Sequence, residues 1–411
     1  LQQPLLDDFG LFGDTAATDQ VLAGTYEPKP GTDPYAVKLL PFLARPSGVK
    51  EGKKEMTEEE YRYGWQQARE STASSYSKIH FGHYKASSRS TKQLALDFIL
   101  ANFPYRTAYT PRRWLHGINV MLEKMQGNFH VNKLRIILLY EADFNQNNKF
   151  MGRDMMKCAE EAGMLAPEQY GSRKNHQAIL AALNKRLTND LLRQRRLAGA
   201  LCANDAKSCY DRIAHSVAIL AIRRLGMPAA PVTSMFKTLQ QSAHHVSTAF
   251  GISQQTYGSN RRIPLQGVGQ GNGAGPAIWA AISSVLIMAM ATQGHGFNIL
   301  SALSSALVSI VCYAFVDDTD IIHSAASTSV KGEEIIGQMQ DILDRWGGLL
   351  RATGGALVPK KSYWYAIDFK WTGSAWKYRT ISDMPGNILI TGIDGERVVL
   401  TRLNPDVAQE T

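Results

Sequence analysis

Three aspartates stand at the ends of two apolar runs of strand length. Asp205 follows the run 198–203, and the adjacent pair Asp317 and Asp318 follows the run 310–316. An acid at the end of a buried strand loses hydration, and two adjacent carboxylates in a tight turn repel each other. A divalent cation removes both costs, because Mg²⁺ takes carboxylate and phosphate oxygens as ligands. The pattern therefore indicates a clamp for two Mg²⁺ ions, which can activate an attacking oxygen and stabilise a leaving one.

Each aspartate also has a plain structural interpretation. Asp is a favoured turn residue, so Asp317 and Asp318 could do no more than form a turn. Asp205 could cap a helix that begins at Ala206. These interpretations are separated by whether carboxylates from two distant segments meet in one place.

The composition is that of a globular chain with a basic excess. Of 411 residues, 44% are apolar and 20% are charged, which argues against disorder throughout the chain. At roughly 100–200 residues per domain, the length allows about two or three subdomains. The formal net charge of +9 suits a polyanionic partner, although such a balance is common in other proteins too. Because the chain begins with Leu and has no charged-then-apolar leader, we expect a piece of a longer polypeptide.

The cysteines and histidines show no metal-binding pattern. No two cysteines form a C-x-x-C pair, and none stands at zinc spacing from a histidine. We therefore expect free thiols in an intracellular protein, with nucleus and cytoplasm both open. The cysteines are Cys158, Cys202, Cys209 and Cys312. The histidines expected to be structural or surface residues are His215, His244, His245 and His323.

One long stretch raises the question of a membrane. Residues 263–316 contain no Lys, Arg, Asp or Glu, and the segments 274–292 and 297–316 are each near spanning length. Both segments are diluted by Ser, Gly, Gln or Asn, and no Lys/Arg clusters or aromatic belts mark their ends. A buried helix followed by a buried strand explains the stretch better, so we expect no membrane partner.

Hydrophobic periodicity predicts the elements that must position the aspartates. Residues 1–50 are expected to form an extended arm or linker, and 57–102 to be helical with interruptions. The helix 175–194 is expected to carry Ile179, Leu180, Leu183, Leu187 and Leu191 on one face. The further predictions, in chain order, are strand 197–204, helix 213–225, strand or hairpin 245–258, helix 277–291, strand 309–316, return strand 319–323, helix 335–350 and hairpin 387–403. This order predicts an α+β fold with an antiparallel sheet covered by helices on one face.

Taken together, these segments resemble the reverse transcriptases of retroelements, closest to the non-LTR retrotransposon type, over about 124–362. Phe315-Val316-Asp317-Asp318 is similar to the family's aromatic-x-Asp-Asp box. The segment 205–211 is similar to its first metal box, in which a bulky aromatic follows the Asp five residues on. The segment 267–276 resembles the Gln-Gly box that opens a palm helix. Three more segments resemble the fingers strand, the template segment and the lysine segment: 134–139, 169–173 and 354–362.

The resemblance implies a right-hand polymerase with fingers and palm. It implies an RNA-directed DNA polymerase that adds dNTPs to the 3′-hydroxyl of a DNA primer on an RNA template, with two Mg²⁺ ions or Mn²⁺. The implied organisation is an N-terminal arm or linker (1–55), an N-terminal extension with fingers (56–196), a palm partly interleaved with the fingers (197–370), and a hairpin leading towards the primer grip (371–411). We expect the family's thumb to lie around or beyond the chain end and so to be missing.

The resemblance also assigns roles to single residues. Asp205, Asp317 and Asp318 hold the metal ions together with Ala206, and Lys361 neutralises or protonates the leaving pyrophosphate. Tyr210 excludes the 2′-hydroxyl of a ribonucleotide by overlap. The residues assigned to the incoming dNTP are Lys124, Arg135, Ala206, Tyr210, Gln270 and Gly271. Those assigned to the template are Gln169, Gly171 and Arg173.

The chain departs from the family pattern, and alternatives stay open. Gly269 stands where the Gln-Gly box usually has Arg, and Gln266-Gly267 is a rival register, although only Gln270-Gly271 places a Pro five residues after the Gly. Lys360 is an alternative to Lys361. An RNA-templated RNA polymerase shares this palm but usually has Gly-Asp-Asp at the metal turn. A third possibility is an inactive remnant that still binds nucleic acid.

Overall fold

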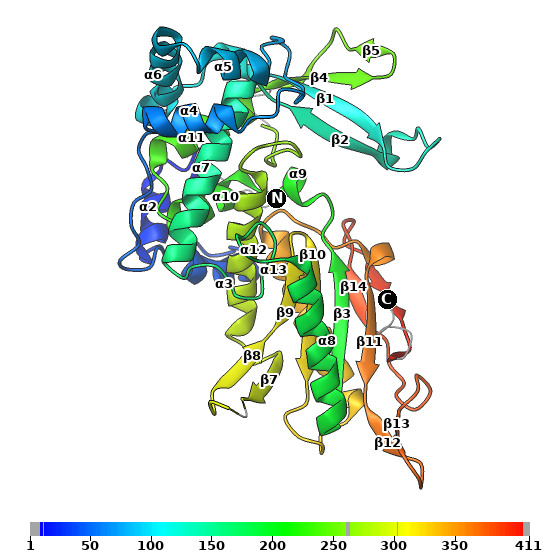
Figure 1. Cartoon of the computed structure of the whole chain (residues 1–411). Helices are drawn as coiled ribbons and strands as arrows, with labels where there is room; N and C mark the ends of the chain where they lie inside the picture. The colour runs from blue at the N-terminus through cyan, green and yellow to red at the C-terminus, as the bar shows by residue number, and fades with distance from the viewer. Residues whose placement is uncertain (1–8, 11, 260–263, 302, 406–411) are drawn as a thin grey trace. The chain divides into compact units, whose positions relative to one another are not determined.

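The structure is a computed structural model that describes residues 9–10, 12–259, 264–301 and 303–405 (Figure 1). The chain divides into two compact units, and α3, α9 and α12 each cross the division in sequence. Unit 1 comprises Leu1–Pro28, Leu43–Met164 and Tyr210–Ala281. Unit 2 comprises Lys29–Phe42, Leu165–Cys209 and Ile282–Thr411.

Unit 1 combines a helical layer with a mixed sheet. In the sheet order β2-β1-β4-β5, strands β1 and β2 are antiparallel, β1 and β4 are parallel, and β6 pairs with β4. Its helices are α2 (Ala16–Ala23), α4 (Glu58–Gln66), α5 (Phe81–Ser87), α6 (Thr91–Thr107), η1 (Arg112–Leu115), η2 (Val131–Lys133), α7 (Ala142–Glu161), α9 (Cys209–Arg212), α10 (His215–Arg224), α11 (Ala229–Gln241) and the first part of α12 (Gly275–Ala291). Its strands are β1 (His116–Glu123), β2 (Leu134–Leu139), β4 (Ala243–Thr248), β5 (Gly251–Ile252) and β6 (Tyr257–Gly258).

Unit 2 is built on a second sheet in the order β16-β11-β3-β10-β9. Only the β16–β11 pair of this sheet is parallel among the described strands. Its helices are α3 (Pro34–Leu43), α8 (Ala178–Arg195), the second part of α12, α13 (Gly332–Ala352) and η3 (Pro359–Lys361). Its strands are β3 (Gly199–Asp205), β7 (Phe297–Leu300), β8 (Leu307–Ile310), β9 (Cys312–Phe315), β10 (Asp318–Ser324), β11 (Tyr363–Ile367), β12 (Phe369–Trp371), β13 (Trp376–Tyr378), β14 (Leu389–Thr391), β15 (Arg397–Val399) and β16 (Thr401–Arg402).

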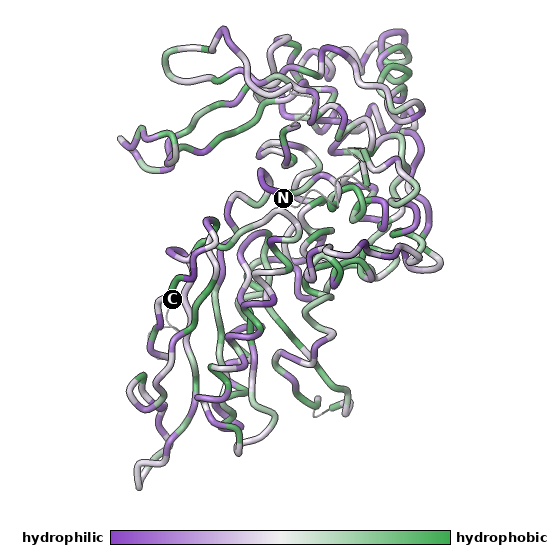
Figure 2. The backbone as a smooth tube through the Cα atoms, turned by 180° about the vertical axis from the view of Figure 1, so that it is seen from behind, coloured by the Kyte–Doolittle hydropathy of each residue, from purple (hydrophilic) through white to green (hydrophobic). Residues whose placement is uncertain are grey.

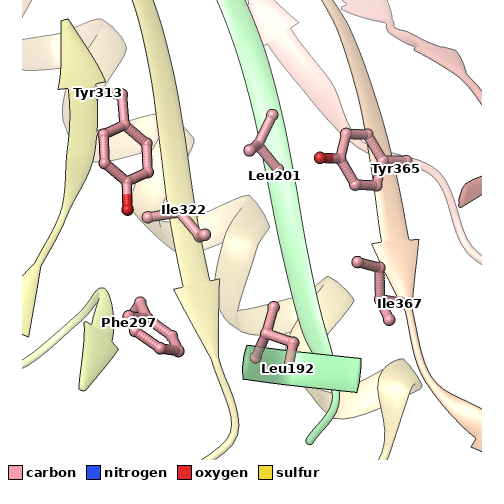
Figure 3. Close-up of a cluster of buried hydrophobic side chains, with 7 residues drawn as sticks. All are labelled: Leu192, Leu201, Phe297, Tyr313, Ile322, Tyr365 and Ile367. Atoms are coloured by element: carbon pink, nitrogen blue, oxygen red, sulfur yellow. The ribbon is translucent and has the colours of Figure 1, made fainter. Parts of the chain in front are cut away.

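Helices cover both faces of the unit 2 sheet, which corrects the expectation of a single covered face. On one face, His323 of β10 bonds through Nε2 to Gln338 Oε1 of α13 at 2.8 Å. On the other face, Leu192 of α8 packs into a buried cluster with Leu201 and Ile322 (Figure 3). Figure 1 shows α8 in front of this sheet and α13 behind it. Leu201 and Ile322 are also direct partners in the β3–β10 ladder, so the cluster fixes the register of these strands.

Most of the apolar face predicted for α8 is exposed, although Leu191 on the same face packs against the buried cluster. Ile179, Leu183 and Leu187 are 66%, 50% and 49% exposed. The buried positions are instead mixed in polarity, and the α8 residues Thr188 and Asn189 bond the hydroxyls of Tyr313 and Tyr365. Polar side chains can face inward here because the sheet supplies tyrosine hydroxyls as partners.

The segment 1–50, expected to be extended, includes the helices α2 and α3 among its described residues. Thr15 caps α2, and Gly24 ends it in the left-handed region with φ 73°. The α2 residues Val21 and Leu22 are buried in unit 1. In unit 2, Tyr35 of α3 lies against Gly348 of α13 so closely that a Cβ there would be 2.4 Å from its ring. Each helix is short, so the surrounding Pro and Gly residues hid it from pattern analysis.

The described part of the charge-free stretch 263–316 contains a buried helix and the three short strands β7, β8 and β9. The helix is α12, as expected, but the predicted strand 309–316 is split at Val311 into β8 and β9. Strand β8 pairs with β7, whereas β9 pairs with β10, so the two halves join different sheets. Figure 2 shows hydrophobic segments along many strands and helices, with hydrophilic segments in many of the loops. Within the described residues, every helix is too short or too polar to cross a bilayer.

Most other elements match their predictions. The helices 57–102, 213–225 and 335–350, the strands 197–204, 245–258 and 319–323, and the hairpin 387–403 are all present with small shifts at their ends. The apolar positions of 335–350 are buried along α13, which confirms the helical period. The four cysteines are free thiols.

His215, which the sequence suggested to be structural, is a buried neutral residue that links three segments of unit 1. Its Nε2 lies 2.6 Å from Gly267 O, and its Nδ1 lies 3.1 Å from Gln240 Nε2. The ring therefore donates to the carbonyl through Nε2 and accepts from the amide through Nδ1. Burial lowers the pKa of His215 to about 4, from an ordinary value of 6.5.

This burial predicts acid sensitivity. A neutral His215 contributes stability above pH 6.5, and that contribution is lost as the pH falls towards 4, at about 1.4 kcal/mol per pH unit for one proton. Urea unfolding between pH 6.5 and 5 should therefore show a smaller loss of unfolding free energy for His215→Gln than for the wild type. His244, whose pKa burial also lowers to about 4, should leave part of the slope in the variant. Equal slopes for both proteins would contradict the assignment.

Candidate active site

The sheet register of unit 2 brings the aspartates together. Asp205 at the end of β3 is the direct cross-strand partner of Asp318 at the start of β10. Direct partners in an antiparallel pair have side chains on the same face, with Cβ atoms roughly 4.5–5.5 Å apart. Asp317 precedes β10 in the turn that follows β9. The turn interpretation of Asp317 and Asp318 is therefore incomplete, because a third carboxylate from a distant segment stands beside them.

Burial and neighbouring carboxylates oppose the ionisation of Asp317 and Asp318. The pKa of Asp317 is raised mainly by burial, and the charge of Asp205 raises it further. The pKa of Asp318 is raised first by burial and then by the charges of Asp317, Asp205 and Asp320. Since like charges directly opposite in a sheet destabilise it, this end of the sheet needs a cation.

Lys361 is a cation at this place. Its Nζ lies 3.1 Å from Asp205 Oδ2, and its charge lowers the pKa of both Asp317 and Asp318. The Lys361 side chain is 65% exposed, whereas that of Asp205 is 19% exposed. The lysine can therefore move away from the carboxylate at little cost, because exposed ion pairs contribute only about 0–1 kcal/mol.

Asp320 is a fourth acid that the sequence analysis missed. It lies two residues beyond Asp318 in β10, so both side chains are on one face of the sheet. Its carboxylate pairs with Lys185 of α8 at 2.8 Å. The spacing Asp318-x-Asp320 within a predicted strand was the signal in the sequence that could have indicated Asp320. Lys185 neutralises Asp320 and not the other three aspartates.

The donor set of this sheet end suits a hard divalent cation. Among the described side chains, no group of three or more His, Cys, Asp or Glu is already arranged to hold a metal ion. The charge of Asp205 nevertheless raises the pKa of both Asp317 and Asp318, and oxygen donors are what Mg²⁺ prefers. Ala206 can contribute only backbone atoms, and it forms an isolated bridge with Leu357 next to the Asp205 strand end.

In unit 1, the two cations expected at the nucleotide lie on one hairpin. Arg135 of β2 pairs directly with Leu122 of β1, and Lys124 comes directly after β1. The period of two in a strand predicts that Lys124 and Arg135 point to the same face of the hairpin. Both are exposed, and the charge of Lys124 lowers the pKa of Asp211, which partial burial raises.

The Gln270-Gly271 loop is fixed to this hairpin through the backbone. Gln270 O accepts a hydrogen bond from Leu138 N at 2.8 Å. Gly271 has φ +125°, and a Cβ there would lie 2.3 Å from Leu138 O, so only glycine fits. Val268 N bonds Tyr210 O at 2.7 Å, which also fixes the loop to the residue expected to select the sugar. The Tyr210 ring is half-buried and lies about 3.6 Å from where a Cβ on Gly275 would stand, at the start of α12.

The sequence of this chain matches a known protein family. The sequence profile of the family "Reverse transcriptase (RNA-dependent DNA polymerase)" matches residues 123–375, more than half of the chain. This chain belongs to the reverse transcriptase family. Members of this family are polymerases of the nucleotidyltransferase type that act on a nucleic-acid template and primer and on nucleotides, and they generally use divalent metal ions. No curated protein matches the chain significantly.

The structure explains how this reverse transcriptase departs from the Gln-Gly box. Gly269 has φ +76°, and a Cβ there would lie 2.5 Å from the Tyr140 hydroxyl, so the usual Arg does not fit. In the rival register, Gln266 Oε1 accepts a hydrogen bond from the backbone N–H of His215 at 2.8 Å. The Gln266 side chain is therefore engaged at the first residue of α10. The side chain of Gln270 is half-exposed and makes no hydrogen bond to the described residues, which favours the Gln270-Gly271 register.

Two of the three residues expected at the template are buried in unit 2. Gln169 is 0% exposed and Gly171 is also buried, and a template contact by either residue stays a prediction. Arg173 is partly exposed, and its Nη1 bonds the carbonyls of Ala166 and Gln169 at 3.0 and 3.2 Å. A template contact by Arg173 stays a prediction.

Proposed function

We propose that this chain is an RNA-directed DNA polymerase of the non-LTR retrotransposon type. It adds dNTPs to the 3′-hydroxyl of a DNA primer on an RNA template. The observation that supports this function most strongly is the β3–β10 register, which pairs Asp205 with Asp318 and leaves Asp317 in the adjoining turn. Membership of the reverse transcriptase family gives the reaction class.

The proposed metal ligands are Asp205, Asp317 and Asp318, with backbone help from Ala206. Two bound Mg²⁺ ions, or Mn²⁺, would supply activation of the primer hydroxyl and stabilisation of the leaving oxygens. Lys361 would then leave Asp205 and bind the pyrophosphate, because its exposed ammonium can neutralise pyrophosphate or donate a proton to it. In unit 1, Lys124 and Arg135 are the groups proposed to bind triphosphate oxygens, for which the guanidinium fork of Arg135 is well suited.

The first prediction concerns the metal ligands. Asp317→Asn should reduce extension of a labelled DNA primer on an RNA template, with Mg²⁺ and dNTPs, by at least about 1,000-fold, because it removes a charge that neutral Asn cannot replace. Asp394→Asn is the matched control, since Asp394 lies in the exposed turn between β14 and β15 and Asn also suits a turn. It should extend the primer like the wild type.

The assay also separates the rival functions. Extension with ribonucleotides in preference to dNTPs would indicate an RNA polymerase. Template binding without extension by the wild type would indicate an inactive remnant. Equal activity of the wild type and Asp317→Asn would exclude the proposed metal site.

A second prediction concerns the choice of sugar. If the Tyr210 ring fills the space that a 2′-hydroxyl needs, Tyr210→Ala should keep much of the dNTP activity and should incorporate ribonucleotides. Tyr210→Phe keeps the ring and should still exclude them. Competition between dNTP and rNTP on the same primer gives the ratio directly. If Tyr210 is instead a packing residue, Tyr210→Ala should lower the free energy of unfolding by about 3–5 kcal/mol. The incorporation of dNTPs and of rNTPs should then fall together.

A further inference from the structure

The segment 168–170 of unit 2 lies along β9, the strand that leads into the turn carrying Asp317 and Asp318. Glu168 O accepts from Ala314 N at 2.9 Å, and Tyr170 N donates to Ala314 O at 2.8 Å. Gln169 and Ala314 accordingly form a parallel bridge. The segment thus extends the sheet beyond β9, where the ladder would otherwise end, and its side chains reach the turn that carries Asp317 and Asp318.

The buried Gln169 amide binds both backbone groups of Val316. Its Oε1 accepts from Val316 N at 3.2 Å, and its Nε2 donates to Val316 O at 3.4 Å. The same amide is held at both ends by other groups, because Oε1 also accepts from Gly171 N at 2.8 Å and Nε2 also donates to Ser283 Oγ of α12 at 2.8 Å. All these atoms belong to unit 2.

Val316 is in a conformation that its side chain disfavours. Its φ is +59°, in the left-handed region, where a β-branched residue is a genuine outlier. Such a conformation costs about 1–3 kcal/mol and persists only where the surroundings impose it. The strained residue directly precedes Asp317, so its backbone angles set the direction in which the Asp317 carboxylate leaves the turn.

Gly171 permits the close approach of the two segments. A Cβ at this position would lie 2.3 Å from Val316 N and 2.8 Å from Val316 Cγ2. Any larger residue would push the segment away from the turn and lengthen the hydrogen bonds of Gln169. The Gln-x-Gly spacing therefore has a structural explanation in the turn that carries Asp317 and Asp318.

We propose that Gln169 is a positioning residue: it holds Val316 in the left-handed conformation and thereby fixes the Asp317 and Asp318 carboxylates for catalysis. This inference rests on the proposed polymerase function for its catalytic consequence. The clamp requires an amide, because one end accepts from two N–H groups and the other donates to a carbonyl and a hydroxyl. Glutamate keeps the accepting end but has no donor when ionised, and leucine has neither.

The test uses Gln169→Leu, Gln169→Glu and a matched control. Gln340 of α13 makes the same kind of clamp elsewhere in unit 2, since its Oε1 accepts from Leu389 N at 2.8 Å and its Nε2 donates to Leu389 O at 2.9 Å. Gln340→Leu removes an equivalent pair of hydrogen bonds without touching the metal turn. All variants are first compared with the wild type by circular dichroism and thermal unfolding.

Hydrogen exchange at the Val316 amide is the readout that needs no activity. In Gln169→Leu the Val316 amide should exchange at least about 10-fold faster than in the wild type. In Gln169→Glu and Gln340→Leu this amide should stay protected from exchange. In primer extension, Gln169→Leu should lower kcat by roughly 100-fold with little change in KM for dNTP, because misplaced catalytic groups cost rate rather than binding.

The outcomes separate the clamp from the proposed function. Faster exchange at Val316 together with a kcat loss confined to the Gln169 variants supports the proposal. Unchanged exchange in a folded Gln169→Leu protein, or wild-type kcat despite faster exchange, overturns it. An equal kcat loss in Gln340→Leu also overturns it, because the effect would then reflect general loss of stability. A wild type without polymerase activity refutes the proposed function, while the exchange data still decide whether Gln169 holds the turn.

Discussion

The repulsion among Asp205, Asp317 and Asp318 is the constraint around which unit 2 is built. The β3–β10 register places two of these carboxylates directly opposite each other, so the fold must hold like charges together against their mutual repulsion. Packing supplies the opposing free energy. Strand β3 is central in the sheet, and both of its faces are covered, by the α8 cluster on one side and by α13 on the other. Each fully buried apolar side chain in such a cluster contributes about 1.5–3 kcal/mol.

The polar groups around this end of the sheet have different roles. Lys361 offsets the charge of Asp205 from an exposed position, and Lys185 separately neutralises Asp320. Gln169 holds the backbone of Val316 from a fully buried position. The buried group thus maintains geometry, whereas the exposed Lys361 can exchange partners. This is the arrangement expected where a rigid first layer of ligands must accept and release a charged substrate.

Much of unit 2 could be predicted from local patterns. The period of α13, the apolar run of β3 and the turn at Asp317 each depend on neighbours in sequence, and the order of boxes implied the palm. The clamp that Gln169 forms on Val316 could not be predicted, because Val316 is 147 positions away and a buried glutamine has no local signature in the sequence. The same limit applies to α8, whose apolar stripe is largely exposed because tyrosine hydroxyls of the sheet hold the polar side of the helix inward. The break at Val311 was hidden because both halves of the run are equally apolar.

The central claim is that this sheet end stores carboxylate repulsion that a divalent cation relieves, and unfolding free energies with and without Mg²⁺ test it most directly. In metal-free buffer near pH 7, Asp317→Asn should be more stable than the wild type by about 1 kcal/mol, because a neutral side chain removes one repelling charge. Adding Mg²⁺ should stabilise the wild type and leave the variant nearly unchanged, since only the folded wild type binds the ion well. A variant that is less stable than the wild type without metal, with equal Mg²⁺ effects on both proteins, would contradict the claim.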